Sequence, residues 1–342
     1  MINSKTDSLN FIIGAGRSGT TLLMNILNNH EDICAPPEHD FLLPFLFNFG
    51  NKNSLTDKDK SDMIDFLWIR KQESQQLWNI DMDNLKNELI GNNKLNSFKD
   101  VYCTILKQYQ NNTTANCIID KNPFYSNYIA KIDSQFQNAK FIAVIRDYRD
   151  RFTSIKKIGS ALKKNNLIRS LTWVKYNNNI IRYEKKKSNQ IHIVRYENLV
   201  TNPQEEIQKI CTFLNLNFQE NMLASQNNIA TVKQGEYSNR INAMHADSRR
   251  EIHQNKINIW KSELTKKEVE ELTCYCGKTA NHLKYADIPS ISFWKKSKTL
   301  IKYLPTYIWL SFLTQLKKTS YQLSLKNQKK LVSFFRKKVL SN

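Results

Sequence analysis

The stretch LNFIIGAGRSGTT, Leu9–Thr21, decides the fold. Its apolar first half, Leu9–Gly14, predicts a short buried strand, and Thr20–Asn29 predicts the helix that follows it. Gly14 and Gly19 have the spacing of a phosphate-binding loop between a strand and a helix. In such a turn successive backbone N–H groups point at an anion, and the helix dipole adds to the attraction. The stretch therefore predicts an anion-binding loop.

This loop lacks the lysine of nucleoside-triphosphate enzymes. Thr20 stands at the lysine position, and Arg17 lies inside the loop instead. In kinases and NTPases the lysine and a Mg²⁺ ion neutralise the phosphates, and Mg²⁺ also needs a carboxylate at a strand end. The candidates, Asp120 and Asp147, each stand beside a cation. Cationic side chains without a metal suit a transferring sulfuryl group, which carries less charge than a phosphoryl group; a P-loop kinase or NTPase is the alternative.

Strand signals recur along the chain, and a helical pattern follows each of them. Alternating strands and helices predict a parallel sheet that helices cover on both faces. Residues 50–116 carry apolar residues at helical spacing and predict a helical insertion, either as core cover or as a lid over the acceptor. The expected fold is a P-loop-type, three-layer α/β domain over residues 1–289, with strands at Leu9–Gly14, Cys117–Asp120, Lys140–Arg146 and Ile191–Tyr196.

The net charge is +20, from 51 basic and 31 acidic residues, and it is unevenly distributed. From Ser290 onward there are twelve Lys or Arg residues and no acidic residue. Residues 290–342 predict a basic, amphipathic helical tail. Lys302 and Pro305 lie within its most apolar part, so the apolar run is too short to span a bilayer. The tail is compatible with contact to an anionic membrane surface, or with a helical appendix that packs partly on the domain.

The N-terminus and the cysteines indicate a reducing compartment. MINSKTDSLN, residues 1–10, has neither the basic nor the apolar region of a signal peptide. The six cysteines form no CxxC pair, which predicts reduced thiols and neither a disulfide framework nor a metal site. We therefore expect a cytoplasmic protein that is membrane-peripheral at most.

A second motif supports a phosphate site. KFIAVIRDYRDRFTSIKK, Lys140–Lys157, predicts a strand that ends in Arg146 and a helix that carries Ser154. An arginine at a strand end and a serine in the following helix can converge on one phosphate. The alternative is an ordinary strand–helix junction in which Arg146 pairs with Asp147 or Asp150.

At this point the chain resembles sulfotransferases that use 3′-phosphoadenosine 5′-phosphosulfate (PAPS). RSGTT, Arg17–Thr21, resembles their 5′-phosphosulfate loop, and Arg146 and Ser154 match the pair that holds the 3′-phosphate. The chain is most similar to the tyrosylprotein sulfotransferase-like branch, over roughly residues 9–285. Three stretches carry that similarity: HEDICAPPEHD with Glu38 at the position of the catalytic glutamate, DKNPF at Asp120–Phe124, and VRYENLVTNP at Val194–Pro203.

The resemblance implies roles for individual residues of the reacting centre. Glu38 is the expected base, and His39 is the rival because imidazole titrates near neutrality. Lys121 ends a strand at the edge of the loop, where its ammonium can reach the leaving oxygen. Arg17 is expected to grip the 5′-phosphosulfate, together with the amides and hydroxyls of Ser18, Gly19, Thr20 and Thr21. The alternative for Glu38 is that it is solvated or pairs with Arg17. The alternative for Lys121 is a surface lysine that pairs with Asp120. The alternative for Thr20 and Thr21 is that they only cap the helix.

The resemblance also implies contacts to the adenosine part of the donor. Arg195 and Tyr196, at the end of the fourth strand, are expected to border the nucleotide; the alternative is that Arg195 only pairs with Glu197. Lys256, four residues before Trp260, resembles a basic position common in these enzymes and is expected near the 3′-phosphate. The segment that precedes it holds further candidates for that phosphate, Arg240, Ser248 and Arg249.

The expected reaction moves a sulfuryl group from PAPS to an acceptor hydroxyl or phenol, without a metal. A basic surface is compatible with an acidic tyrosine-containing peptide, an anionic glycan or a lipid-linked sugar as acceptor. We expect no nucleic-acid partner, because helical spacing explains the aromatic residues among the tail lysines. The alternative from a different class is a non-catalytic protein that binds nucleic acid or an anionic membrane through the tail.

Overall fold

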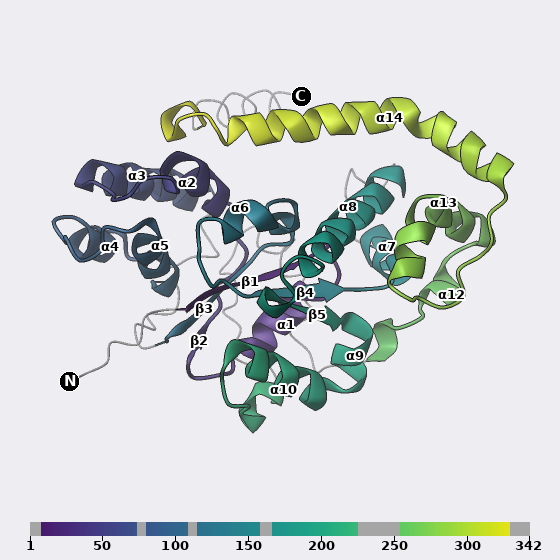
Figure 1. Cartoon of the computed structure of the whole chain (residues 1–342), viewed down its shortest axis with the longest axis horizontal. Helices are drawn as coiled ribbons and strands as arrows, with labels where there is room; N and C mark the ends of the chain where they lie inside the picture. The colour runs from purple at the N-terminus through teal and green to yellow at the C-terminus, as the bar shows by residue number, and fades with distance from the viewer. Residues whose placement is uncertain (1–7, 74–79, 109–114, 158–165, 225–253, 329–342) are drawn as a thin grey trace.

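The computed structural model describes residues 8–73, 80–108, 115–157, 166–224 and 254–328, and these fold around one parallel sheet (Figure 1). Within these ranges the sheet has five strands in the order β2-β3-β1-β4-β5, and every neighbouring pair is parallel. The α/β prediction is confirmed, and β2 is a strand that the sequence did not predict. The strands are β1 (Ser8–Gly14), β2 (Ile33–Cys34), β3 (Cys117–Lys121), β4 (Phe141–Ile145) and β5 (Ile191–Arg195).

Helices cover both faces of the sheet. Ile12 packs with α1 (Thr20–Leu27), α9 (Tyr196–Thr201) and α10 (Pro203–Leu214) on one face. Its neighbours Phe11 and Ile13 belong to the core on the other face, because successive strand side chains point to opposite sides. The helices of that other side are α2 (Leu42–Phe49), α3 (Asp57–Glu73), α4 (Met82–Leu89), α5 (Phe98–Lys107), α6 (Ile129–Asp133), α7 (Tyr148–Lys157), α8 (Asn166–Glu184) and α13 (Lys266–His282).

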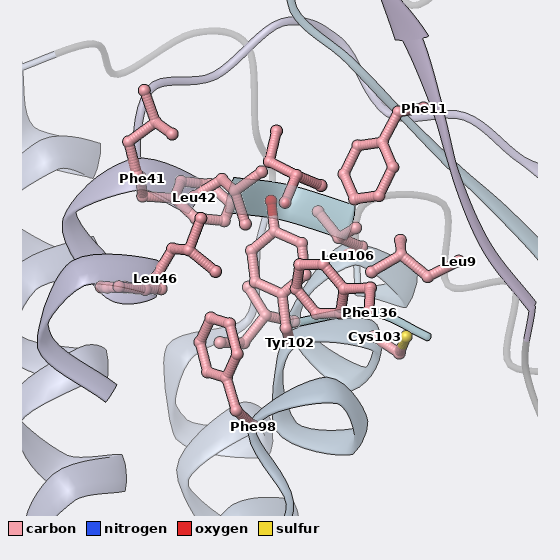
Figure 2. Close-up of a cluster of buried hydrophobic side chains, with 14 of the residues drawn as sticks. Leu9, Phe11, Phe41, Leu42, Leu46, Phe98, Tyr102, Cys103, Leu106 and Phe136 are labelled. Atoms are coloured by element: carbon pink, nitrogen blue, oxygen red, sulfur yellow. The ribbon is translucent and has the colours of Figure 1, made fainter. Parts of the chain in front are cut away.

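Within segment 50–116, the described residues form α3, α4 and α5, and their buried side chains extend the core. Figure 2 shows the aromatic centre of this core, where Tyr102 of α5 lies beside Phe98 and Phe136. Tyr102 is fully buried, and its hydroxyl donates a hydrogen bond to Asp120 Oδ2 in β3 at 2.7 Å. The helical segment therefore supports the edge of the sheet where the site residues lie.

The described part of the predicted basic tail, residues 290–328, contains α14 (Phe293–Ser320), a long helix that runs along the outside of the molecule (Figure 1). It contacts α13 and α8. No helix in the described ranges is both long enough and apolar enough to span a bilayer. The short helices η1 (Pro123–Asn127), η3 (Ser188–Gln190), η4 (Glu220–Leu223), η6 (Gln254–Lys256) and α12 (Trp260–Glu263) complete the described chain.

Candidate active site

The loop between β1 and α1 needs glycine at both ends. Gly14 has φ +151° and Gly19 has φ +97°. A Cβ atom on Gly14 would lie 2.4 Å from the carbonyl oxygen of Val144, and one on Gly19 would lie 2.5 Å from the ring of Tyr196. The two glycines thus allow the loop to pass close to β4 and to Tyr196. Gly19 also begins α1 without a side-chain cap, which leaves the first turn of the helix open to an anion.

Three contacts from other elements hold the loop in place. The hydroxyl of Ser126 accepts the Gly14 N–H at 3.0 Å and donates to the Gly14 carbonyl at 3.1 Å. Arg151 Nε donates to the Gly16 carbonyl at 2.7 Å. Arg17 adopts φ +72°, and its Nε donates to Ser154 Oγ of α7 at 3.2 Å. The loop and the second motif therefore meet directly through Arg17 and Ser154.

One buried hydroxyl of the loop lacks a partner. Ser18 is completely buried, and its Oγ makes no hydrogen bond within the described residues. A buried polar atom without a partner is costly, so such atoms in native sites often mark a place where a ligand binds. The Ser18 hydroxyl therefore has hydrogen-bonding capacity that the described residues leave unused.

Glu38 and Lys121 form an ion pair beside the loop. Lys121 Nζ lies 2.9 Å from Glu38 Oε2 and donates to Thr21 Oγ1 at 3.4 Å. The Lys121 side chain is only 2% exposed, whereas that of Glu38 is 49% exposed. Lys121 is therefore paired with Glu38, and the alternative pairing of Lys121 with Asp120 is not observed. The partner of Glu38 is Lys121, so the alternative pairing of Glu38 with Arg17 is not observed either. Lys121 thus joins the half-exposed carboxylate to the start of α1.

His39 lies beneath this pair, in a buried network. Its Nε2 is 3.0 Å from Asp120 Oδ1, and both side chains are almost fully buried. Its ring stacks on Phe41 with 3.7 Å between the ring centroids, and the Asn122 side chain donates to its carbonyl at 2.6 Å. The Tyr102 hydroxyl completes the network around Asp120. The network fixes the loop that carries Glu38 to the end of β3.

Arg146 connects the loop to Tyr196 and to Lys256. Its guanidinium lies 4.0 Å from the ring centroid of Tyr196. It donates to the Arg17 carbonyl at 3.3 Å and to the Lys256 carbonyl at 2.6 Å. Its buried Nε has no hydrogen-bond partner within the described residues. Lys256 thus meets this cluster through its backbone, a contact that its residue type does not predict.

The acidic residues near Arg146 are engaged elsewhere. Asp147 pairs with Arg149 at 2.7 Å, and Asp150 accepts the backbone N–H groups of Asn258 and Trp260 at 2.8 and 3.0 Å. The alternative in which Arg146 pairs with Asp147 or Asp150 is therefore not observed. Burial raises the pKa of the Asp150 carboxyl above its usual value, and the two backbone donors oppose that rise. Asp150 fixes the segment that carries the Lys256 carbonyl.

Glu197 is a partly buried carboxylate, which the sequence suggested only as a partner for Arg195. Its Oε1 accepts the Asp147 N–H at 2.9 Å, and burial raises the pKa of its carboxyl. Arg195 instead donates to the Leu283 carbonyl and lies 5.0 Å from the Tyr285 ring centroid. The residue types did not predict the contact between Glu197 and the Asp147 N–H, because this contact depends on the pairing of β4 with β5.

The structure thus brings the predicted residues into two adjoining groups. Arg17, Ser154, Arg146, Tyr196 and the Lys256 carbonyl form one, and Thr21, Glu38 and Lys121 form the other. Arg240, Ser248 and Arg249 lie outside the described residues. Within the described ranges, no three His, Cys, Asp or Glu side chains are grouped in a way that could hold a metal ion.

A comparison with known families bears on this arrangement. The sequence profile of the sulfotransferase family matches residues 10–220, which include the loop, Glu38, Lys121 and the second motif. The chain belongs to the sulfotransferase family. The resemblance stated from the motifs is confirmed, and the protein is a sulfotransferase enzyme.

Individual relatives agree with the family assignment. A Caenorhabditis briggsae protein named "Putative protein-tyrosine sulfotransferase" is 28% identical over 225 residues, which are 64% of this chain and 70% of that protein. The solved sulfotransferase domain from the curacin biosynthetic pathway has a TM-score of 0.56 at 23% identity, over 83% of this chain and 99% of its own. The sulfotransferase domain from the Synechococcus PCC 7002 olefin synthase has a TM-score of 0.54 at 20% identity, over 84% and 98%. The two domains share the fold of this sulfotransferase.

Proposed function

We propose that this sulfotransferase transfers the sulfuryl group of PAPS to a hydroxyl or phenol, with Glu38 as the base. One observation carries the proposal: the buried Lys121 ammonium contacts both the half-exposed Glu38 carboxylate and Thr21 at the start of α1. A candidate base, a cation and the anion-binding loop are therefore within one hydrogen-bonded chain of residues. Sulfuryl transfer needs these three groups close together.

The residues of the loop and of the second motif fit the two anionic ends of PAPS. The open first turn of α1, the Ser18 hydroxyl and the Arg17 side chain are suited to the 5′-phosphosulfate. The Arg146 guanidinium and the Ser154 hydroxyl, which Arg17 connects, are suited to the 3′-phosphate. The Tyr196 ring lies close to both Arg146 and Gly19, which supports a role for it beside the nucleotide between the two anionic ends.

The proposed chemistry is a direct displacement at sulfur. The bond from the acceptor oxygen to sulfur forms while the bond from sulfur to the 5′-phosphate oxygen breaks. Glu38 takes the acceptor proton, which its exposure to solvent permits because an acceptor can approach it. Lys121 and Arg17 stabilise the negative charge that develops on the leaving oxygen.

The surroundings of His39 favour Glu38 over it as the base. The His39 side chain is 4% exposed, and it is engaged by Asp120 and stacked on Phe41. An acceptor hydroxyl has no access to a ring packed in this way, so we assign His39 to holding the loop. Separate Glu38→Gln and His39→Asn variants test the assignment by turnover. Loss of turnover in the histidine variant alone would make His39 the base.

Ligand-dependent thermal shift tests the donor without knowledge of the acceptor. We expect 3′,5′-ADP to raise the melting temperature and ATP with Mg²⁺ to have little effect. Preferential stabilisation by ATP and Mg²⁺ would reject the PAPS proposal in favour of a kinase-like donor site.

The acceptor is then found with radiolabelled PAPS and a panel of hydroxyl compounds. Acidic tyrosine-containing peptides come first in the panel, because the Caenorhabditis briggsae relative is named for protein tyrosine. Anionic polysaccharides, lipid-linked sugars and simple phenols follow. All six cysteines are buried and free, which supports the cytoplasm as the compartment in which to look for the acceptor.

A further inference from the structure

Large hydrophobic side chains are exposed mainly on one helix. Apart from Trp68 on α3, every exposed large hydrophobic side chain in the described ranges lies on α14 or just after it. They are Phe293, Trp294, Leu300, Ile301, Leu304, Ile308, Phe312, Leu316 and Leu323. Isolated exposed apolar residues are ordinary, but a contiguous set of them marks an interaction surface.

Five of these side chains form a stripe along α14. Ile301, Leu304, Ile308, Phe312 and Leu316 follow one another at intervals of three or four residues, so they share one face of the helix. Their exposed fractions run from 50% to 71%. We call these five residues the α14 stripe.

Aromatic and basic residues accompany the α14 stripe. Phe293 and Trp294, at the start of the helix, are 74% and 81% exposed. Lys298, Lys302 and Lys318 are exposed along the same helix. Aromatic rings together with lysines whose stems reach along an apolar face are typical of helices that lie at a lipid–water boundary.

The rest of the protein holds α14 at both ends. Near its start, Lys295 forms an ion pair with Glu270, and the Tyr275 hydroxyl donates to the Thr299 carbonyl at 3.1 Å. Just after its end, the Tyr321 ring is buried and stacks on Phe47 of α2. The helix is therefore attached to α13 near its start and, through Tyr321 just after its end, to α2 (Figure 1). The side chains of the α14 stripe remain exposed.

The charge of the tail identifies the partner. Residues 290–342 carry twelve Lys or Arg residues and no acidic residue, which favours an anionic surface. A helix of 28 residues is about 42 Å long at the usual rise, and it can lie flat on a bilayer with its apolar stripe among the lipid chains. We propose that α14 docks this sulfotransferase on an anionic lipid bilayer, with the α14 stripe in the interface and the lysines at the headgroups.

Vesicle co-sedimentation of the full chain tests the proposal. We expect binding to phosphatidylcholine vesicles that contain phosphatidylserine, weak binding to phosphatidylcholine alone, and release by salt. The double variant Ile308→Gln/Phe312→Gln removes two apolar anchors and should weaken binding about tenfold or more. The double variant Lys298→Glu/Lys302→Glu should weaken binding only to the anionic vesicles.

Matched controls come from α3, whose residues do not belong to the α14 stripe. Trp68→Gln removes another exposed apolar side chain, and Lys58→Glu reverses another exposed lysine; both should bind vesicles as the wild type does. Equal melting temperatures and equal stabilisation by 3′,5′-ADP show that all variants are folded.

Three results would overturn the proposal. The first is the absence of binding to anionic vesicles at low salt. The second is vesicle binding that Lys298→Glu/Lys302→Glu weakens but Ile308→Gln/Phe312→Gln does not, because the contact would then be electrostatic alone, without the α14 stripe in the interface. The third is a wild-type dimer that Ile308→Gln/Phe312→Gln converts to a monomer, because the α14 stripe would then be an interface between two copies of this chain.

Discussion

Replacing Lys121 by methionine should separate activity from stability. The Lys121 ammonium is 2% exposed, and its partners are the Glu38 carboxylate, which is half-exposed, and the Thr21 hydroxyl. Taking an ammonium out of water costs several kcal/mol, and a half-solvated partner recovers only part of that cost. Lys121→Met removes the buried charge and keeps most of the side-chain volume. We expect the free energy of unfolding to stay unchanged or to rise by about 1–2 kcal/mol.

The effect on turnover should be opposite and large. If Lys121 stabilises the leaving oxygen, its removal should lower kcat about 10²–10³-fold, as the loss of one preorganised donor does in other enzymes. Glu38→Gln should also lower kcat strongly, because it removes the base. It should lower stability as well, by about 1 kcal/mol, because the buried ammonium then faces a neutral partner.

Two assays on the same preparations compare the effect of each variant on stability with its effect on kcat. Urea denaturation gives the free energy of unfolding, and transfer of radiolabelled sulfate from PAPS to the identified acceptor gives kcat. A Lys121→Met protein that keeps more than a tenth of the wild-type kcat would refute the role in leaving-group stabilisation. One that loses kcat only in proportion to a loss of folded protein would show that Lys121 is merely structural.

Three further changes probe the rest of the site and the fold. Ser154→Ala should weaken binding of 3′,5′-ADP about tenfold and leave binding of 5′-AMP unchanged in calorimetric titrations; equal losses would show that Ser154 does not face the 3′-phosphate. Gly19→Ala should destabilise the protein by about 2–4 kcal/mol in urea denaturation, because φ is +97° and the added Cβ meets the Tyr196 ring. Gly16→Ala in the same loop should have little effect, since its Cβ would meet nothing within 4 Å. Burial lowers the pKa of His192 below 6.5, so the unfolded chain binds the extra proton more readily and stability should fall as the pH drops below about 6.5. His192→Phe should reduce that fall between pH 7.5 and 5.5, and an identical pH dependence in both proteins would contradict the assignment.

Local backbone requirements explain why so much of the site could be predicted. Gly14 and Gly19 both have positive φ, and a Cβ atom at either position would lie within 2.5 Å of another chain segment. Only glycine fits there, so the residue type itself reveals the loop. Arg146 and Ser154 follow one strand at fixed intervals, and the strand–helix turn alone brings them to the same edge of the sheet.

The partners of Glu38 and His39 could not be predicted from local sequence. Lys121 Nζ meets Glu38 across 83 residues of chain, and His39 turns away from Glu38 to meet Asp120. These contacts exist because β3 lies next to β1 in the sheet and because α5 places Tyr102 beneath it. Strand order is a property of the whole chain, and no spacing between neighbouring residues encodes it.

The sequence by itself determined the α/β fold, the position of the glycine-containing loop after β1, the strand-end arginine and the helix α14 in the basic tail. Each of these depends on backbone conformation or on periodicity within a few residues, which the residue types encode directly. Only the tertiary structure decided which carboxylate meets Lys121, that His39 is buried, and that the Lys256 carbonyl closes on Arg146. It also decided that the apolar stripe of α14 is exposed, because periodicity predicts a helix face but the packing of other elements determines what covers it.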